Sequence, residues 1–459
     1  MPEAEGRSAD ARLFQRLGPA GRRLLEGFPS LTPIQRDAIP LILDGRNVMV
    51  VARTASGKTE AVLAPILTLA RKGKWTGRPA VLYVAPTRAL VSDLHRRIAS
   101  RLAGLVDVGR RTGEYREPDR DLLFTTPESL DSMLARGGSG EGKGRSGSQG
   151  HALSGVRAIV LDEVHQLAEN ARGAQLQVLL GRLEEVTGAP LLRIGLSATV
   201  SSPEALARRF LGEGAVVSLT GGHRRLNVRL RDGYSEIPWR GEGVDPLVDE
   251  ILRVRRGAAG ARGMAAMLLA ERREIGRLKA LVFVASRARC DELSTGLGVA
   301  LKGRCPARVA AHHGSLDRGH RERTEELLLK AEESVAVATM TLELGIDIGD
   351  IGLVVLDGAP GSVSSLLQRV GRSNRRTGTV RVVPMAKDDV EAAVLASMIR
   401  SAEDGDLDEV PAVAHYSVAI QQLASILYQG TNARRRRKHL ERLLDGILDG
   451  EAAWALEPW

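Results

Sequence analysis

Residues 47–60, NVMVVARTASGKTE, decide the fold of this chain. The apolar run 47–51 predicts a buried strand, which leads through the loop 52–57 into a helical pattern. A strand, a glycine-containing loop and a helix in that order are typical of a phosphate-binding site, where backbone N–H groups cradle phosphates. We expect Lys58 to reach the β and γ phosphates and the Thr59 hydroxyl to take a Mg²⁺ position.

This loop alone does not define the class of protein. Ala52 stands where the strict pattern has its first glycine, and Gly-Lys-Thr suits a kinase or a GTPase equally. A second motif narrows the choice, because the apolar run 158–161 ends in Asp162 and Glu163. Carboxylates at the end of a buried parallel strand face the ligand edge of its sheet. Asp162 would orient Mg²⁺ and Glu163 would polarise an attacking water, unless the strand simply ends in solvated acids.

Two further segments carry polar groups at strand ends. Ser197-Ala198-Thr199 follows the next apolar strand, so its hydroxyls could bond to the acidic motif, although the tripeptide is otherwise ordinary loop sequence. The segment 339–347 follows the strand 335–338 and places Thr341 near a nucleic-acid phosphate and Asp347 near a ribose, or forms a plain turn.

A pair of arginines lies late in the chain. A helix is expected to start at Ser362–Ser365, and Arg372 and Arg375 are three residues apart, so one helical face can present both. Two guanidinium groups there could stabilise charge on a transferring phosphoryl group. A solvated basic helix or a backbone-phosphate contact explains them equally well.

The apolar runs form two sets with helical stretches between them. The first set is 47–51, 80–84, 158–161 and 191–194, and the second is 281–284, 308–311, 335–338 and 353–356. They lack period-2 alternation, as expected of parallel strands covered on both faces. The rhythm predicts two α/β domains that meet near residues 212–226. We also expect a surface loop at 137–150, an inserted helix within 257–279 and a helix at 417–428 before the basic run 434–438.

The amino-acid composition indicates which kinds of partner and which cellular location to expect. The 459 residues carry a formal charge of +9, which favours anionic partners such as nucleic acid, although a GC-rich genome that encodes arginine freely gives the same balance. Cys290 and Cys305 have neither disulfide nor metal spacing, and the N-terminus has no apolar signal region. A cytoplasmic protein is therefore expected.

The whole series of motifs resembles the superfamily 2 DExH-box helicases, and within them the Lhr (large helicase-related) group. The motifs are 31–35, 52–60, 85–90, 126–130, 162–165, 197–200, 312–315, 342–348 and 368–375, and the resemblance covers roughly residues 28–400. It implies an α/β fold of two RecA-like domains with parallel sheets and a short helical C-terminal extension. The domains would be 1–27 as an N-terminal extension, 28–215 and 216–402 as RecA-like domains 1 and 2, and 403–459 as the helical extension with a partial winged helix.

The resemblance also implies roles for individual residues. ATP would be bound by Gln35, Thr54, Ala55, Ser56, Gly57, Lys58, Thr59, Glu60, Gly345 and Asp347, with Gln35 at the adenine edge. Catalysis would fall to Lys58, Asp162, Glu163, His165, Arg372 and Arg375, and Mg²⁺ to Thr59, Asp162 and Glu163. Nucleic acid would contact Pro86, Thr87, Arg88, Thr126, Pro127 and Glu128, then Ser286, Arg287, His313, Gly314, Ser315 and Thr341.

The expected activity is that of an ATP-dependent helicase or translocase moving 3′ to 5′, on single-stranded DNA rather than RNA. An RNA helicase of the same architecture remains open. So does an ATP-gated nucleic-acid clamp that serves a protein complex without processive unwinding.

Overall fold

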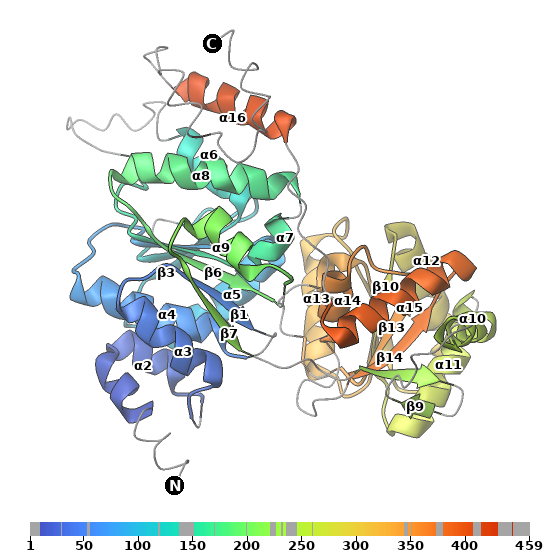
Figure 1. Ribbon diagram of the computed structural model, residues 1–459. Coiled ribbons are helices and arrows are strands. Elements are labelled where there is room, and N and C mark those ends of the chain that lie inside the picture. Colours follow the sequence, from blue (N-terminus) through green and yellow to red (C-terminus); the bar gives the residue numbers. More distant parts are fainter. Residues whose placement is uncertain are drawn as a thin grey trace. The chain divides into compact units, whose positions relative to one another are not determined.

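The computed structural model describes residues 10–28, 30–52, 56–117, 120–136, 151–168, 170–198, 200–220, 226–230, 233–235, 246–258, 260–343, 348–349, 351–372, 380–406, 415–429 and 443. The chain folds into two compact units (Figure 1). The first comprises Met1–Gly221 with Glu409–Trp459, and the second comprises Gly222–Asp408.

The first unit is built on a seven-stranded parallel sheet of order β3-β4-β2-β5-β6-β1-β7. Its strands are β1 (Val48–Ala52), β2 (Val81–Val84), β3 (Val108–Arg111), β4 (Leu122–Thr125), β5 (Ala158–Leu161), β6 (Leu192–Ser197) and β7 (Val216–Thr220). Val48 and Val50 of β1 enter one buried apolar cluster, and Met49 and Val51 enter another. Each face of the sheet therefore supports its own core, which explains the unbroken apolar strands.

Helices cover both faces of this sheet. They are α2 (Pro19–Leu25), α3 (Pro33–Leu43), α4 (Lys58–Lys72), α5 (Arg88–Leu102), α6 (Pro127–Arg136), α7 (Val164–Ala168), α8 (Ala171–Thr187), α9 (Pro203–Leu211) and α16 (Tyr416–Gln429). Residues of α3, α4 and α5 share one cluster, and residues of α6 to α9 share the other. The predicted C-terminal helix at 417–428 is confirmed as α16, which packs on α8 of this unit through a separate apolar cluster.

The predicted domain boundary at 215/216 is wrong. Val216–Thr220, assigned to the second domain, form β7 and pair in parallel with β1. Their edge position in the first sheet satisfies the backbone of β1, so the first unit includes them. The expected N-terminal extension is also part of this unit, because α2 packs closely on α4. A Cβ added at Gly21 would lie 2.6 Å from the carbonyl oxygen of Ala64.

The second unit has a seven-stranded sheet of order β11-β12-β10-β13-β14-β8-β9, in which only β9 runs antiparallel to its neighbour. Its strands are β8 (Leu226–Leu230), β9 (Gly233–Ser235), β10 (Lys279–Val284), β11 (Arg308–His312), β12 (Ser334–Ala338), β13 (Leu353–Asp357) and β14 (Val380–Met385). The helices are α10 (Pro246–Ala258), α11 (Gly260–Ile275), α12 (Arg287–Leu301), α13 (Arg318–Lys330), the 3₁₀ turn η1 (Met340–Leu342), α14 (Val363–Val370) and α15 (Asp389–Asp404). The helix predicted within 257–279 is α11.

Candidate nucleotide and nucleic-acid sites

The phosphate loop occupies the predicted place between β1 and α4. Gly57 has φ +85°, a left-handed conformation that favours glycine. A side chain there would also collide, because a Cβ would lie 2.5 Å from Gln35 Nε2. Lys58 opens α4, is buried, and its Nζ donates to the Ser197 carbonyl oxygen at 2.9 Å. The predicted loop residues Thr54 and Ala55 lie outside the described residues.

Gln35 and its neighbour Thr32 hold this loop from the side. The Gln35 Oε1 accepts the Thr32 backbone N–H at 3.0 Å, and its Nε2 donates to the Gly57 carbonyl at 3.4 Å. The Thr32 hydroxyl donates to the Ser56 carbonyl at 3.0 Å. Gln35 is fully buried beside the loop. Its contact with adenine stays a prediction. Glu60, in the first turn of α4, pairs with Arg101 at 3.0 Å.

The acidic motif lies at the end of β5, two strands from β1 in the sheet order. Asp162 and Glu163 are both buried. Burial, and then the neighbouring charge of Glu163, raise the pKa of Asp162 to about 6. Glu163 has φ +45°, a rare conformation for a residue with a side chain, and its N–H donates to Asp162 Oδ1 at 2.9 Å. Strained backbone of this kind is concentrated at functional sites.

Tyr83 is a site residue that the sequence reasoning missed. It is fully buried on β2, and its hydroxyl donates to Asp162 Oδ2 at 2.9 Å. The Thr59 side chain lies beside the same hydroxyl. Thr59, in the first turn of α4, and Asp162, directly after β5, meet at this one oxygen. The only available signal was a phenol in the buried run VLYV, because a buried Tyr hydroxyl usually has a polar partner.

The predicted link between the acidic motif and Ser197 is confirmed. The His165 Nδ1 lies 3.1 Å from the Ser197 hydroxyl and accepts the Ala198 N–H at 3.3 Å. An N–H can only donate, so Nδ1 is unprotonated and a neutral ring carries its proton on Nε2. Burial lowers the pKa of His165 to about 4, which agrees with a neutral ring. Thr199 lies outside the described residues.

The residues predicted to hold Mg²⁺ fit that ion. Thr59 and Asp162 meet at Tyr83, and Glu163 is adjacent in sequence, so a hydroxyl and two carboxylates gather at one edge of the sheet. Hard cations such as Mg²⁺ prefer oxygen ligands and are commonly held by one or two carboxylates together with substrate phosphates. Within the described part of the chain, no group of three His, Cys, Asp or Glu side chains could hold a metal ion by itself.

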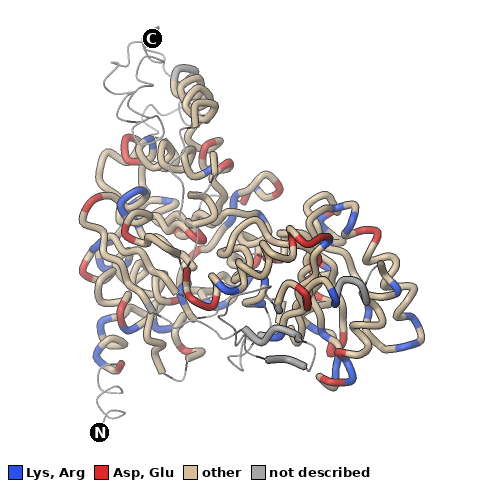
Figure 2. Tube along the Cα trace, turned by 45° about the vertical axis from the view of Figure 1, so that its right-hand side comes forward, with Lys and Arg blue, Asp and Glu red and all other residues tan. Residues whose placement is uncertain are grey.

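A basic pocket lies beside the motifs predicted to contact nucleic acid in the first unit. Its volume is about 470 Å³. Among its lining residues are the predicted Pro86, Arg88, Thr126 and Glu128, and the unpredicted Arg111, Thr112, Gly113, Arg116, Ser129, Ser132 and Arg172. Four arginines against one carboxylate give the lining a formal charge of +3. In Figure 2, segments with Lys or Arg (blue) and segments with Asp or Glu (red) are interspersed over both units. The net charge of the chain therefore does not point to a nucleic-acid surface, whereas the local cluster of arginines in the basic pocket does.

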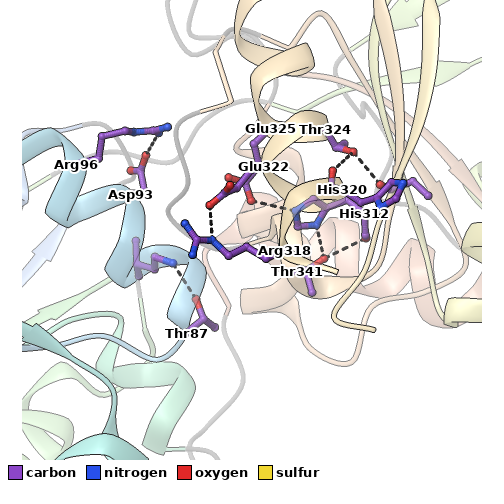
Figure 3. A network of polar contacts seen from close by, with 12 residues as sticks. Thr87, Asp93, Arg96, His312, Arg318, His320, Glu322, Thr324, Glu325 and Thr341 are labelled. Atoms are coloured by element: carbon purple, nitrogen blue, oxygen red, sulfur yellow. Dashed lines mark hydrogen bonds and ion pairs between the residues drawn. The ribbon is translucent and has the colours of Figure 1, made fainter. Parts of the chain in front are cut away.

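Hydrogen bonds fix the walls of this basic pocket. Arg172, near the start of α8, donates to Glu128 at 2.6 Å and to the Pro86 carbonyl at 2.5 Å. The Thr87 hydroxyl caps α5 by accepting the Leu90 N–H at 3.2 Å (Figure 3). Pro127 begins α6. The two predicted motifs and α8 are thereby joined into one surface.

The predicted residues of the second unit gather at the carboxyl ends of β10, β11 and β12. The Ser286 hydroxyl caps α12, which Arg287 begins. His313 is buried and its Nε2 lies 2.9 Å from Asp291. Thr341 lies in η1 and contacts His312, which directly precedes the segment His313-Gly314-Ser315 (Figure 3).

The helix expected to start at Ser362–Ser365 is α14 (Val363–Val370), but it ends before Arg372. The helix α14 ends at Val370 with Gly371 as its cap, so Arg372 lies in the following turn. Its Nη2 donates to the Glu343 carbonyl oxygen at 2.6 Å. Arg375, Gly345 and Asp347 lie outside the described residues.

Cys290 and Cys305 are both free thiols. In the described ranges no helix is long and apolar enough to cross a membrane.

The sheets and the site define the class of the protein. A phosphate loop, a strand-end acid pair and a polar sensor on one parallel α/β sheet, followed by a second such sheet, are the features of a tandem RecA-like nucleotide-binding protein. Residues 32–206 match the DEAD/DEAH box helicase family, and residues 265–377 match the helicase conserved C-terminal domain. The chain belongs to the superfamily 2 helicases and is similar to their Lhr group.

Individual relatives agree with this assignment. The ATP-dependent helicase Lhr-Core of Methanocaldococcus jannaschii is 32% identical over 414 residues, which cover 83% of this chain and 45% of the relative. The Lhr helicase/probable uracil glycosylase of Mycolicibacterium smegmatis is 31% identical over 449 residues, covering 87% of this chain and 29% of the relative. The chain therefore spans less than half the length of these two relatives.

A solved structure shows the same fold. The Mycobacterium smegmatis helicase Lhr, bound to single-stranded DNA and AMP-PNP, superposes with a TM-score of 0.76 and 27% identity. The match covers 97% of this chain and 57% of that chain. The predicted fold of two RecA-like domains is confirmed.

Proposed function

We propose that this chain is an ATP-dependent nucleic-acid helicase or translocase that moves 3′ to 5′ along single-stranded DNA. One observation carries the proposal. In the first unit the nucleotide residues and the basic pocket follow the ends of neighbouring parallel strands, so both lie at one edge of a single sheet. The Lhr protein of M. smegmatis, similar in fold, was solved with single-stranded DNA and AMP-PNP.

The nucleotide chemistry assigns a role to each buried group. Lys58 exchanges its contact with the Ser197 carbonyl for the β and γ phosphates. Glu163 positions and polarises the attacking water, and the neutral His165 ties this motif to Ser197. Thr59 and Asp162 would hold Mg²⁺, whose charge would offset that of the phosphates. Arg372 and Arg375 are proposed to stabilise charge on the transferring phosphoryl group.

The nucleic-acid contacts are proposed to go to phosphates and sugars. Guanidinium groups, hydroxyls and helix N-termini are the usual donors to such groups, and they position a strand without reading its sequence. The basic pocket supplies these donors in the first unit. In the second unit Ser286, the N-cap of α12, and Thr341, within η1, supply hydroxyl donors. Contacts of this kind suit movement along a strand of any sequence.

An ATPase assay without nucleic acid, with single-stranded DNA and with single-stranded RNA tests the proposal. We expect DNA to stimulate turnover most, and Glu163→Gln to abolish turnover while nucleotide still binds. Duplexes with a 3′ or a 5′ overhang then test direction, and only the 3′ overhang should support strand displacement. Stronger stimulation by RNA would favour an RNA helicase, and turnover without displacement would favour a clamp. Turnover that no nucleic acid alters would refute the proposal.

A further inference from the structure

His312, the last residue of β11, is fully buried, and both of its ring nitrogens have partners. The Nε2 lies 3.1 Å from Glu325 Oε1 on α13, and the Nδ1 lies 2.8 Å from Thr341 Oγ1 (Figure 3). The Thr341 hydroxyl also donates to the His312 carbonyl oxygen at 3.1 Å. The Thr341 hydroxyl therefore meets His312 at two atoms.

The sheet explains why these residues meet. The strands β11 and β12 pair in parallel with His312 opposite Ala338, and η1 follows β12, which brings Thr341 over the end of β11. A Cβ added at Gly314 would lie 4.0 Å from Thr341 Cγ2, so Thr341 also borders the segment proposed to contact nucleic acid. His312 itself is buried behind that segment.

A count of the protons available shows that this contact uses the hydroxyl proton of Thr341. A carboxylate only accepts hydrogen bonds, so Glu325 requires a proton on His312 Nε2. If His312 is neutral, its Nδ1 is bare and competes with the His312 carbonyl oxygen for the single hydroxyl proton of Thr341. If His312 is charged, Nδ1–H donates to Thr341 Oγ1, and the hydroxyl proton goes to the His312 carbonyl. In both states His312 holds the only proton with which the Thr341 hydroxyl could bind a phosphate oxygen, which is itself an acceptor.

We propose that His312, oriented by Glu325, competes with nucleic-acid phosphate for the Thr341 hydroxyl and so weakens the grip of the second unit. Thr341 binds a phosphate through its hydroxyl only after that hydroxyl turns away from His312. His312 is thus a positioning residue that touches no nucleic acid. The inference rests on the proposed function, because it takes Thr341 as a phosphate contact.

Two amide substitutions test the hydrogen bonds of the two ring nitrogens separately. In His312→Gln the longer amide reaches as far as Nε2, keeps Glu325 and leaves the more distant backbone carbonyl of residue 312 as the remaining acceptor for Thr341. In His312→Asn the shorter amide reaches only as far as Nδ1 and keeps Thr341. Binding of labelled single-stranded DNA is measured without nucleotide. We expect His312→Gln to bind about fivefold tighter, the effect of removing one competing hydrogen bond, and His312→Asn to stay within about twofold of the parent.

A double-mutant cycle identifies the group that is released. Thr341→Val removes the hydroxyl, so adding His312→Gln to it should change nothing. The salt dependence of His312→Gln should match that of the parent, because no charge is gained. If His312→Gln does not fold, Thr341→Ser gives the same readout, since serine turns more freely about χ1 than β-branched threonine and should bind tighter.

Weaker or unchanged binding by a folded His312→Gln would overturn the inference, as would tighter binding that persists with Thr341→Val. Unchanged binding by Thr341→Ser would overturn it where His312→Gln does not fold. If the parent protein binds DNA and hydrolyses ATP, the proposed function still holds although the inference fails. A parent that binds neither DNA nor RNA refutes both.

Discussion

Replacing Gln422 by leucine tests how the C-terminal helix is held on the first unit. Gln422 lies on α16, fully buried, between Asp131 of α6 and Arg182 of α8. Its Oε1 accepts a hydrogen bond from Arg182 Nη1 at 2.6 Å, and its Nε2 donates one to Asp131 Oδ2 at 2.8 Å. Leucine is of similar size and has no polar atom, so the substitution removes both bonds, and a longer one at 3.4 Å from Nε2 to Gln421 Oε1, while it keeps the apolar contacts.

The structure sets the size of the effect. A hydrogen bond to a charged group contributes about 1.5–3 kcal/mol. Asp131 and Arg182 still bond to each other at 3.0 Å, so neither charge is left alone and the lower value applies to each lost bond. The two bonds together then stabilise the docked helix by about 3 kcal/mol, which corresponds to roughly a hundredfold change in its opening equilibrium.

Amide hydrogen exchange of residues 416–429 measures that opening directly. The matched control is Gln421→Leu on the same helix. Gln421 is exposed and donates one longer bond to Asp131 at 3.2 Å, so its loss should cost less than about 1 kcal/mol. Equal exchange rates in the two variants would refute the assignment of Gln422 as the anchor. Faster exchange across all of the first unit would instead show that the substitution loosens the whole core.

Four further outcomes follow from the described contacts. Lys58→Ala should reduce ATP turnover at least about a hundredfold, and near-parental rates would remove it from the nucleotide site. Tyr83→Phe should keep the ring packing but raise the Mg²⁺ concentration for half-maximal nucleotide binding by about tenfold, while an unchanged requirement would leave the phenol a purely structural group. Arg172→Ala should weaken DNA binding and lower its salt slope by about one, with nucleotide binding alone as the control. The hydrogen bond from Arg36 lowers the pKa of Asp10, so the pair stabilises the fold above the ordinary carboxyl range and loses that effect as the pH falls through the depressed pKa. Asp10→Asn should therefore lower the melting temperature at neutral pH, and the difference from the parent should shrink on acidification.

The apolar strands were predictable because parallel strands buried on both faces read as unbroken apolar runs. All eight predicted strands exist, and the two sheets follow from their order. Shorter or mixed strands gave no such signal. The strand β3, Val108–Arg111, is half polar, and β7 lies at a sheet edge after a glycine-rich turn. The strand β7 falls inside the predicted junction at 212–226, so pattern alone assigned it to the wrong unit.

The motifs of the site were predictable because carboxyl ends of parallel strands meet at one edge. Contacts between residues far apart in the chain were not. Arg172 joins the basic pocket through a contact with Pro86, which is distant in sequence and so cannot be predicted from a local pattern. The error at Arg372 was avoidable, since Gly371 directly before it is a common helix terminator.

The sheet order explains how the two candidate sites of the first unit are joined. Along the edge, β4 and β2 lead into the basic pocket, and β5, β6 and β1 lead into the nucleotide residues. The strand β2 serves both, because Tyr83 bonds to Asp162 while Pro86, three residues later, lines the pocket. A shift of β2 along its own axis would change both sites at once. Tyr83→Phe removes that link without disturbing the pocket, so it should reduce the stimulation of turnover by DNA more than it reduces DNA binding.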